Sequence, residues 1–378
     1  EMDEEDVDER ADIYGVGLVL YELLTLHLPT VPRDSDEAMQ DHVHRLVEFR
    51  LETPDSIRER VPEASAALDR TMNRCLDPDP ACRIESAEEL ASALRGCLQL
   101  KQTERALPAK SKPLTWFERW PLWSIVAFTL LPHVAGSVLN ISYNKWIVSE
   151  LNAAQQSTFN WLVLAYNLII YPACTVGVIR WIVLPALRYR RALEGVGETN
   201  VDFDAARRQA LRWPRIAAGL ASIGWFPGIV FFPLGLQLLS PPVTLEQTRH
   251  FCLSISLSGL LAFTYSVVGL QLVALRYFYA QLWDDAEQMH QTARKELGSS
   301  RLLNFTSQVL AGSIPLLGAF LFVMGQNQTM DAEHFRVFQY ISLGLIVLGF
   351  GGFQLAITIG SYITKTIDAL TGTDDDSE

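Results

Sequence analysis

Six long apolar stretches after Trp120 constrain the fold of this chain more than any other feature of its sequence. A helix needs roughly 20 apolar residues to cross the hydrocarbon core of a bilayer. Each stretch is long enough, and a spanning segment must satisfy its own backbone hydrogen bonds, which favours helices. We therefore predict an all-α fold in which residues 120–368 form a polytopic bundle of six membrane helices. The stretches cover about residues 122–142, 161–184, 216–239, 253–275, 305–325 and 337–363.

Basic residues concentrate in alternate loops of this region. Five lie in residues 101–121, seven in 188–215 and four in 276–301. The other three loops hold one each, namely Lys145, Arg249 and Arg336. Because loops rich in Lys and Arg stay on the cytoplasmic side, both termini are predicted to be cytoplasmic in a multi-pass protein surrounded by membrane lipid.

The spacing of Pro and Gly suggests that the six helices are three repeated hairpins. Prolines recur in the odd stretches at 132, 227 and 315, and glycines in the even stretches at 177, 269 and 352. The alternative is chance, because both residue types are common in membrane helices.

The first hundred residues differ in charge from the rest of the chain. They carry 10 Arg, no Lys and 24 Asp or Glu, whereas the remainder carries 21 basic and 19 acidic residues. An acidic surface disfavours nucleic acid as a partner, since phosphate binding requires a basic one. The five cysteines form no C-x-x-C pair and have no histidine at metal-ligand spacing, so neither a disulfide framework nor a metal site is expected.

Residues 1–97 have the pattern of a soluble unit of about four helices. Apolar residues recur at helical spacing from Ile13 to Leu24, and further helices are predicted near 37–50 and 64–76. A fourth starts at Ser86, with Glu89 completing a capping box. We expect residues 98–119 to form a basic, Pro-containing linker, and residues 369–378 an acidic tail.

Two motifs in this unit carry a family resemblance. The run from Asp8 to Thr25 reads DERADIYGVGLVLYELLT, and the runs CLDPDPACR and SAEEL begin at Cys75 and Ser86. Together they resemble the second half of the C-terminal lobe of bacterial serine/threonine protein kinases, in which a helix of this type follows the activation segment. The resemblance covers residues 1 to about 97 and implies a partial kinase C-lobe, a bacterial plasma membrane location, and a role in signal transduction.

The resemblance also implies roles for individual residues. Asp12 matches the helix aspartate that accepts hydrogen bonds from the catalytic-loop backbone, and Arg83 matches the arginine that pairs with the glutamate of the A-P-E motif. Glu1 is a candidate for that glutamate, although the spacing is about one residue short. Neither role is catalytic. Departures from the family pattern occur at Ala11, Thr30 and Ile84, where Ser or Thr, Phe, and Pro are usual.

The motifs that bind ATP and Mg²⁺ in such kinases are absent from the 378 residues. His44-Arg45-Leu46 lacks the catalytic Asp, and Asp202-Phe203-Asp204 lacks the Gly of D-F-G. Gly15-Val16-Gly17 is interpreted as a site of close helix packing. We expect the missing motifs to precede Glu1 in a longer polypeptide that uses ATP and Mg²⁺, and this chain alone to be inactive.

Few ionisable side chains lie within the apolar stretches, and such residues are functional candidates. His133 is interpreted as a hydrogen-bonded packing residue, with proton relay as the alternative. Arg180 and Arg276 are close enough to basic loops to reach the membrane surface. Gln271 and Gln354 are candidates for bridging neighbouring helices.

Three hypotheses for function follow. The first is the C-terminal part of a membrane-anchored kinase, whose protein substrate and oligomeric state the sequence leaves unknown. The second is a non-catalytic scaffold, or pseudokinase remnant, on a membrane anchor. The third is a transporter with a degenerate regulatory domain, which rests on the hairpin pattern and lacks a cluster of charges at the membrane midplane.

Overall fold

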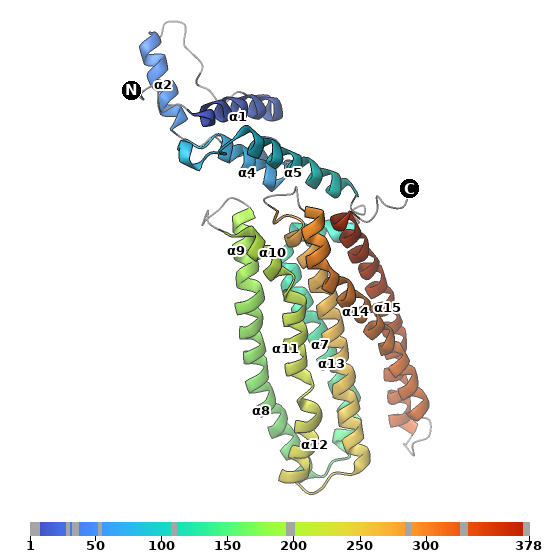
Figure 1. Cartoon of the computed structure of the whole chain (residues 1–378). Helices are drawn as coiled ribbons and strands as arrows, with labels where there is room; N and C mark the ends of the chain where they lie inside the picture. The colour runs from blue at the N-terminus through green and yellow to red at the C-terminus, as the bar shows by residue number, and fades with distance from the viewer. Residues whose placement is uncertain are drawn as a thin grey trace, which may run out of the picture. The chain divides into compact units, whose positions relative to one another are not determined.

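The computed structural model confirms the predicted all-α fold. It describes residues 8–27, 31, 38–51, 55–106, 112–193, 201–283, 289–325 and 332–372, and these contain helices and no strands. The chain divides into two compact units (Figure 1). The first comprises residues up to Leu107 with the short segments 281–293 and 370–372, and the second comprises the remainder.

Helix α1 is central to the first unit. It packs on α4, which in turn contacts α5 (Figure 1). The core consists of apolar side chains from these helices and from the segments between them. Ile84, which stands where the kinase pattern has Pro, is fully buried in this core, so the departure adds apolar contact. The helices are α1 (Glu9–Thr25), α2 (Met39–Arg50), α3 (Ile57–Arg60), α4 (Ala66–Cys75), the 3₁₀ turn η2 (Pro80–Cys82) and α5 (Ala87–Ala106).

The start of α5 confirms the predicted cap and changes one detail of it. Ser86 Oγ accepts the backbone N–H of Glu89 at 3.2 Å. The Glu89 carboxylate accepts the N–H of Glu85 at 2.9 Å, one residue before the expected partner. It also accepts a hydrogen bond from Arg74 Nη2 at 2.7 Å, which ties α4 to α5. Although burial favours its protonated form, these partners hold the pKa of Glu89 below its usual value.

The predicted linker over residues 98–119 is largely helical. Helix α5 continues to Ala106, and α6 spans Lys112–Arg119 with Pro113 in its first turn. An already capped helix continues readily through good helix formers such as Leu100, Lys101 and Gln102. The role of residues 98–119 as a linker remains a prediction. The predicted acidic tail lies mostly outside the described residues, and α15 occupies its first positions.

The second unit contains six helical segments long and apolar enough to cross a membrane, found among the described residues. Large apolar side chains cover their outer surfaces, as lipid contact requires. In Figure 1, α8 and α15 lie at opposite edges of this unit. The helices are α7 (Pro121–Ser149), α8 (Ala153–Val178), α9 (Leu184–Leu193), α10 (Phe203–Ala210), α11 (Trp213–Trp225), α12 (Gly228–Leu239), α13 (Leu245–Val273), α14 (Met289–Gly325) and α15 (Ala332–Thr371).

Three of these segments depart from regular α-helix. The third is divided between α11 and α12 at Pro227, because a proline lacks the N–H that would continue the hydrogen-bond ladder. The second and fourth contain the π-helical turns η3 (Ile179–Val183) and η4 (Ala274–Tyr279). Arg180 and Arg276 therefore both lie in π-helical turns, a geometry that often marks functional positions.

Helices α7 and α13 form the closely packed centre of the second unit. A Cβ at Gly269 would collide with the ring of Phe128, so this glycine lets the Phe128 side chain of α7 pack directly on the backbone of α13. The proposed three-hairpin repeat remains a prediction.

Candidate functional site

Helix α1 has two faces with opposite environments. Ile13, Gly17 and Tyr21 are buried against the rest of the first unit. On the opposite face, Val16, Val19 and Leu23 are 46%, 56% and 70% exposed. The helix is therefore apolar on both sides, although the described part of the unit covers only one of them.

Asp12 lies at the N-terminal end of this exposed face, next to its apolar residues. It lies in the first turn of α1, and the spacing Asp12, Val16, Val19, Leu23 places the four side chains in one stripe. Within the described residues no group hydrogen-bonds to the Asp12 carboxylate, which borders a shallow surface hollow with Val16 and Val19. Asp12 thus presents an acceptor beside an apolar strip.

The predicted departure at Ala11 does not leave α1 uncapped. The helix begins earlier than the kinase pattern suggests, and Asp8 is its N-cap, accepting the N–H of Arg10 at 3.0 Å. Arg10 also donates from Nη1 to the carbonyl of Pro80 at 3.1 Å. Thr30 and Glu1, named above from the pattern, lie outside the described residues.

Arg83 supports the segment that precedes α5. Its Nε donates to the carbonyl of Asp77 at 2.6 Å and its Nη2 to that of Pro78 at 3.1 Å. The guanidinium carbon lies 4.7 Å from the centre of the Tyr14 ring, which is a cation–π distance. Arg83 thereby joins α1 to the Asp-Pro turn, and its predicted pairing with Glu1 remains a prediction.

The other sequence fragments that resemble catalytic motifs have local structural roles. His44 lies on exposed α2 and pairs with Glu48 at 3.5 Å. Asp202 is the N-cap of α10 and accepts the N–H of Ala205 at 2.9 Å. A Cβ at Gly17 would lie 2.9 Å from the Cβ of Cys75, so this glycine permits close packing of α1 on α4, whereas Gly15 has nothing within 4 Å.

The thiols of the first unit differ in environment. Cys75 is fully buried, and burial raises its pKa to about 11, so it is a neutral apolar side chain at neutral pH. Cys82 is exposed, and the nearby Asp79 carboxylate raises its pKa. All five cysteines are free, and no cluster of potential metal ligands occurs among the described residues.

His133 contacts Trp225 within the second unit. The indole Nε1 donates to His133 Nδ1 at 3.1 Å, and the two rings stack. Because Nδ1 is the acceptor, a neutral imidazole must carry its proton on Nε2. This geometry suits the packing role expected for His133, and it connects α7 to α11.

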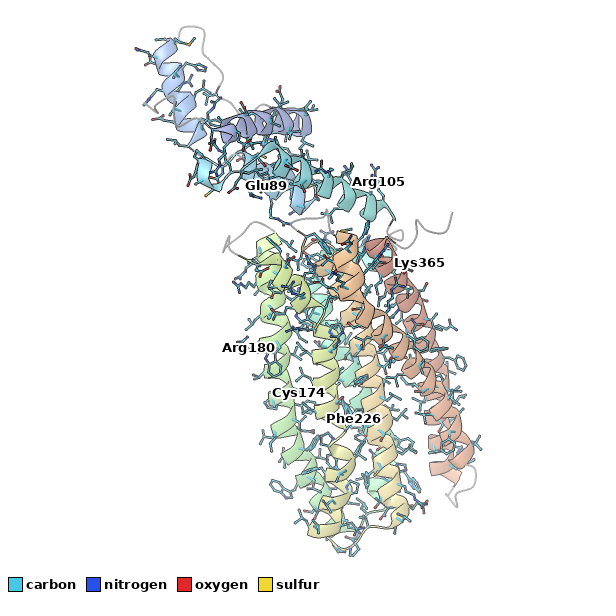
Figure 2. The ribbon with its side chains drawn as sticks, viewed as in Figure 1. Glu89, Arg105, Cys174, Arg180, Phe226 and Lys365 are labelled. Atoms are coloured by element: carbon cyan, nitrogen blue, oxygen red, sulfur yellow. The ribbon has the colours of Figure 1, made fainter. Side chains whose placement is uncertain are left out.

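The remaining polar candidates differ from one another. Gln271 donates from Nε2 to the carbonyl of Ser300 at 2.6 Å and so joins α13 to α14. Gln354 is exposed on α15 and makes no side-chain hydrogen bond to any described residue. Arg180 is exposed on η3 (Figure 2). Arg276 is 8% exposed and lies over the Tyr362 ring at 5.8 Å, so it packs inside the bundle instead of reaching outward.

A buried charge network was not foreseen from the sequence. Arg207 is 2% exposed and pairs through Nε with Glu296 at 3.1 Å and through Nη1 with Asp204 at 2.8 Å. Tyr279 donates its hydroxyl to the same Glu296 carboxylate at 3.0 Å. The network joins α10, η4 and α14. Glu296 and Tyr279 lie far from Arg207 in the sequence. Arg207 itself belongs to a basic loop from which the sequence predicts only the orientation in the membrane.

Comparison with known proteins gives partial matches to bacterial kinases. The probable serine/threonine-protein kinase SCO3848 of Streptomyces coelicolor is 33% identical over 94 residues, which are 25% of this chain and 13% of that protein. Serine/threonine-protein kinase pkn3 of Myxococcus xanthus is 35% identical over 107 residues, 28% of this chain and 18% of that protein. PknJ of Mycobacterium tuberculosis is 31% identical over 108 residues, 28% of this chain and 17% of that protein.

The chain therefore covers less than a fifth of the length of each of these relatives. No model of a known protein family matches it, and no solved structure is significantly similar. The chain thus combines a short region of similarity to serine/threonine kinases with six helices suited to a membrane.

Proposed function

We propose that residues 1–97 form the second half of the C-terminal lobe of a bacterial serine/threonine protein kinase. The six-helix bundle would anchor this lobe in the bacterial plasma membrane, with both termini in the cytoplasm. ATP and Mg²⁺ would be bound by a segment that precedes Glu1, and the complete enzyme would transfer phosphate from ATP to Ser or Thr of a protein.

The uncovered apolar face of α1 carries this proposal. Val16, Val19 and Leu23 form a strip on a helix whose other face is already packed into a core. An apolar strip of this kind calls for another protein surface. The rest of a kinase lobe, including the catalytic loop that the resemblance places at Asp12, would supply one.

The position of Asp12 adds a polar requirement at the same face. A carboxylate accepts several charge-assisted N–H hydrogen bonds, and this one has no partner among the described residues. The loop that carries the catalytic residues would provide backbone N–H groups here. Asp12 would then be a positioning residue, acting on the reaction only through the shape of that loop.

The test uses the protein translated from the complete reading frame, reconstituted in nanodiscs with [γ-³²P]ATP and Mg²⁺. Asp12→Asn keeps the size of the side chain and removes its charge. We expect the rate of autophosphorylation to fall about 10²-fold, the scale of effect seen when a catalytic group is slightly misplaced, with little change in the KM for ATP.

The matched control is Glu9→Gln. Glu9 is the other acidic residue in the first turn of α1, so it shares any helix-dipole effect with Asp12 but not the family position. We expect its activity to equal that of the wild type. If both variants lose the same fraction of autophosphorylation rate, Asp12 acts only as a charge that stabilises the helix. A complete protein that neither binds ATP nor phosphorylates would instead support the scaffold.

A further inference from the structure

We propose that a cavity in the second unit binds an anionic glycerophospholipid, with its phosphate at Lys145 and an ester carbonyl at Asn140. The cavity measures about 360 Å³ and lies between α7, α8, α11, α12 and α13. That volume is in the range of sites for small ligands, so the open cavity would hold the glycerol region and part of one acyl chain while the rest of the lipid stays in the bilayer. The inference concerns the bundle alone and is independent of the proposed kinase function.

The cavity is apolar at its walls and polar along one helix. Val163, Ile170, Phe232 and Phe251 contribute apolar surface from three different helices. Such surface suits an acyl chain, whose apolar character it shares. Figure 2 shows Cys174 and Phe226 within this unit, on α8 and beside the break between α11 and α12.

The polar stripe lies on α7. His133, Ser137, Asn140 and Asn144 are spaced by four, three and four residues, and all line the cavity. Such a row of polar groups in a membrane helix is costly unless each group has a partner. Asn144 donates to Asn140 Oδ1 at 2.9 Å and accepts from Ser254 at 3.0 Å, so part of the stripe is satisfied internally.

The groups left over are mostly donors. Asn140 already uses its oxygen, and within the described residues its amide nitrogen has no acceptor. Asn167 on α8 faces the same cavity without a hydrogen-bond partner among those residues. Among the described residues that line the cavity, Lys145 carries the formal charge. These donors suit a ligand that supplies oxygen atoms, and the ammonium group of Lys145 favours one that is anionic.

The spacing of these donors fits a phospholipid. Lys145 lies five residues beyond Asn140 on α7, which is about 7.5 Å along a helix axis. A glycerophospholipid carries ester carbonyls roughly one glycerol unit from its phosphate, so one molecule can place its phosphate at Lys145 and an ester carbonyl at Asn140. The acyl chain would then run toward His133, which lines the cavity together with its hydrogen-bond donor Trp225.

The experiment places the whole chain in nanodiscs of phosphatidylcholine containing a few mole per cent of phosphatidylglycerol with a diazirine in its acyl chain. Illumination followed by peptide mapping should give saturable labelling of α7 and α8. Unlabelled phosphatidylglycerol should compete, and further phosphatidylcholine should not. We expect Lys145→Gln and Asn140→Leu each to lower the saturable labelling at least fivefold.

Arg249→Gln is the matched control. It removes a positive charge near the start of α13, at the same end of the bundle, but Arg249 does not line the cavity. Its labelling should equal that of the wild type. Lys145 is exposed, so its variant also decides the question should Asn140→Leu fail to fold.

Three results would overturn the proposal. The first is labelling that rises linearly with the mole fraction of diazirine lipid and is the same in every variant, as expected of bulk lipid. The second is equal sensitivity to Lys145→Gln and Arg249→Gln, which would indicate a general surface charge effect. The third is a diazirine-bearing palmitate that labels the same peptides and is not displaced by phosphatidylglycerol, which would assign the cavity to a free fatty acid.

Discussion

At the residue scale, the last turn of α1 contains a strained backbone position. Leu26 is the C-cap, with φ 57° and ψ 23°, and its side chain is 85% exposed. This left-handed conformation costs a residue with a Cβ roughly 1–2 kcal/mol and a glycine very little. Helix C-caps of this geometry are usually glycine, so Leu26 has the backbone geometry of the cap without the residue that favours it.

Leu26→Gly is therefore expected to stabilise α1 by about 1 kcal/mol. The measurement is hydrogen exchange of the amides in the last two turns of α1, in the whole chain. Leu51→Gly is the control, because Leu51 caps α2 at φ −78° and is 69% exposed. It should give no stabilisation. Faster exchange in Leu26→Gly would contradict the strain argument.

Gly17 and Gly15 form a second comparison on the same helix. A methyl group at Gly17 must displace Cys75, which should cost roughly 1–3 kcal/mol through overpacking. A methyl group at Gly15 meets nothing, so Gly15→Ala should gain up to about 1 kcal/mol of helix propensity in this chain.

The Cys75 thiol reports both effects, because it reacts only when its surroundings open. Under native conditions at pH 8, its alkylation rate should rise at least about fivefold in Gly17→Ala and stay equal or fall in Gly15→Ala. The reverse order of rates would show that the α1–α4 contact is not as close as the structure has it.

At the scale of elements, the Arg207–Glu296 pair connects α10 to α14. Both groups are largely buried. Without Glu296, Arg207 keeps only the exposed carboxylate of Asp204, and without Arg207, the Glu296 carboxylate loses its nearest cation. Glu296→Gln and Arg207→Met should each lower the free energy of unfolding by about 3–5 kcal/mol, and the double variant by less than the sum. Denaturation in detergent by increasing SDS measures this.

Arg208→Gln is the control for that cycle. Arg208 approaches the same carboxylate at 3.9 Å but is 52% exposed, and exposed pairs contribute little. Its variant should unfold within about 1 kcal/mol of the wild type. Strictly additive effects of Arg207→Met and Glu296→Gln would mean that the two charges do not depend on each other.

The elements also show what the sequence could predict. The length of the apolar stretches located the six helices, because each must carry enough consecutive apolar residues to span the hydrocarbon core. Helical spacing and the Ser86 cap located the start of α5, whereas its continuation to Ala106 depends on helix propensity past Leu98 and not on apolar spacing. The break at Pro227 was missed, since proline alone does not distinguish a kink from a cap.

The cavity was missed for a different reason. Asn140 and Asn167 lie on different helices, and only packing brings them to one space. The signal that was available is the spacing of His133, Ser137, Asn140 and Asn144, which marks one polar face of an otherwise apolar helix. His133 by itself indicates a packing residue, and only its spacing with the other three marks the polar stripe.

At the scale of the whole molecule, the chain contains two parts that differ in charge and in the polarity of their surfaces. An acidic helical unit with one uncovered apolar face precedes a bundle whose outer surface suits lipid. The proposed kinase function explains the first feature through a missing half of the lobe, and the proposed lipid site gives the bundle a role beyond anchoring.

The most direct test is the accessibility of position 19 on the uncovered face of α1. Val19→Cys, with Cys82→Ser to remove the exposed thiol, is alkylated in this chain and in the polypeptide from the complete reading frame. Glu88→Cys on exposed α5 is the control and should react equally in both. We predict that Val19→Cys reacts readily in this chain and at least tenfold more slowly in the longer polypeptide. Equal rates, or a reading frame with no coding sequence before Glu1, would contradict the partial lobe.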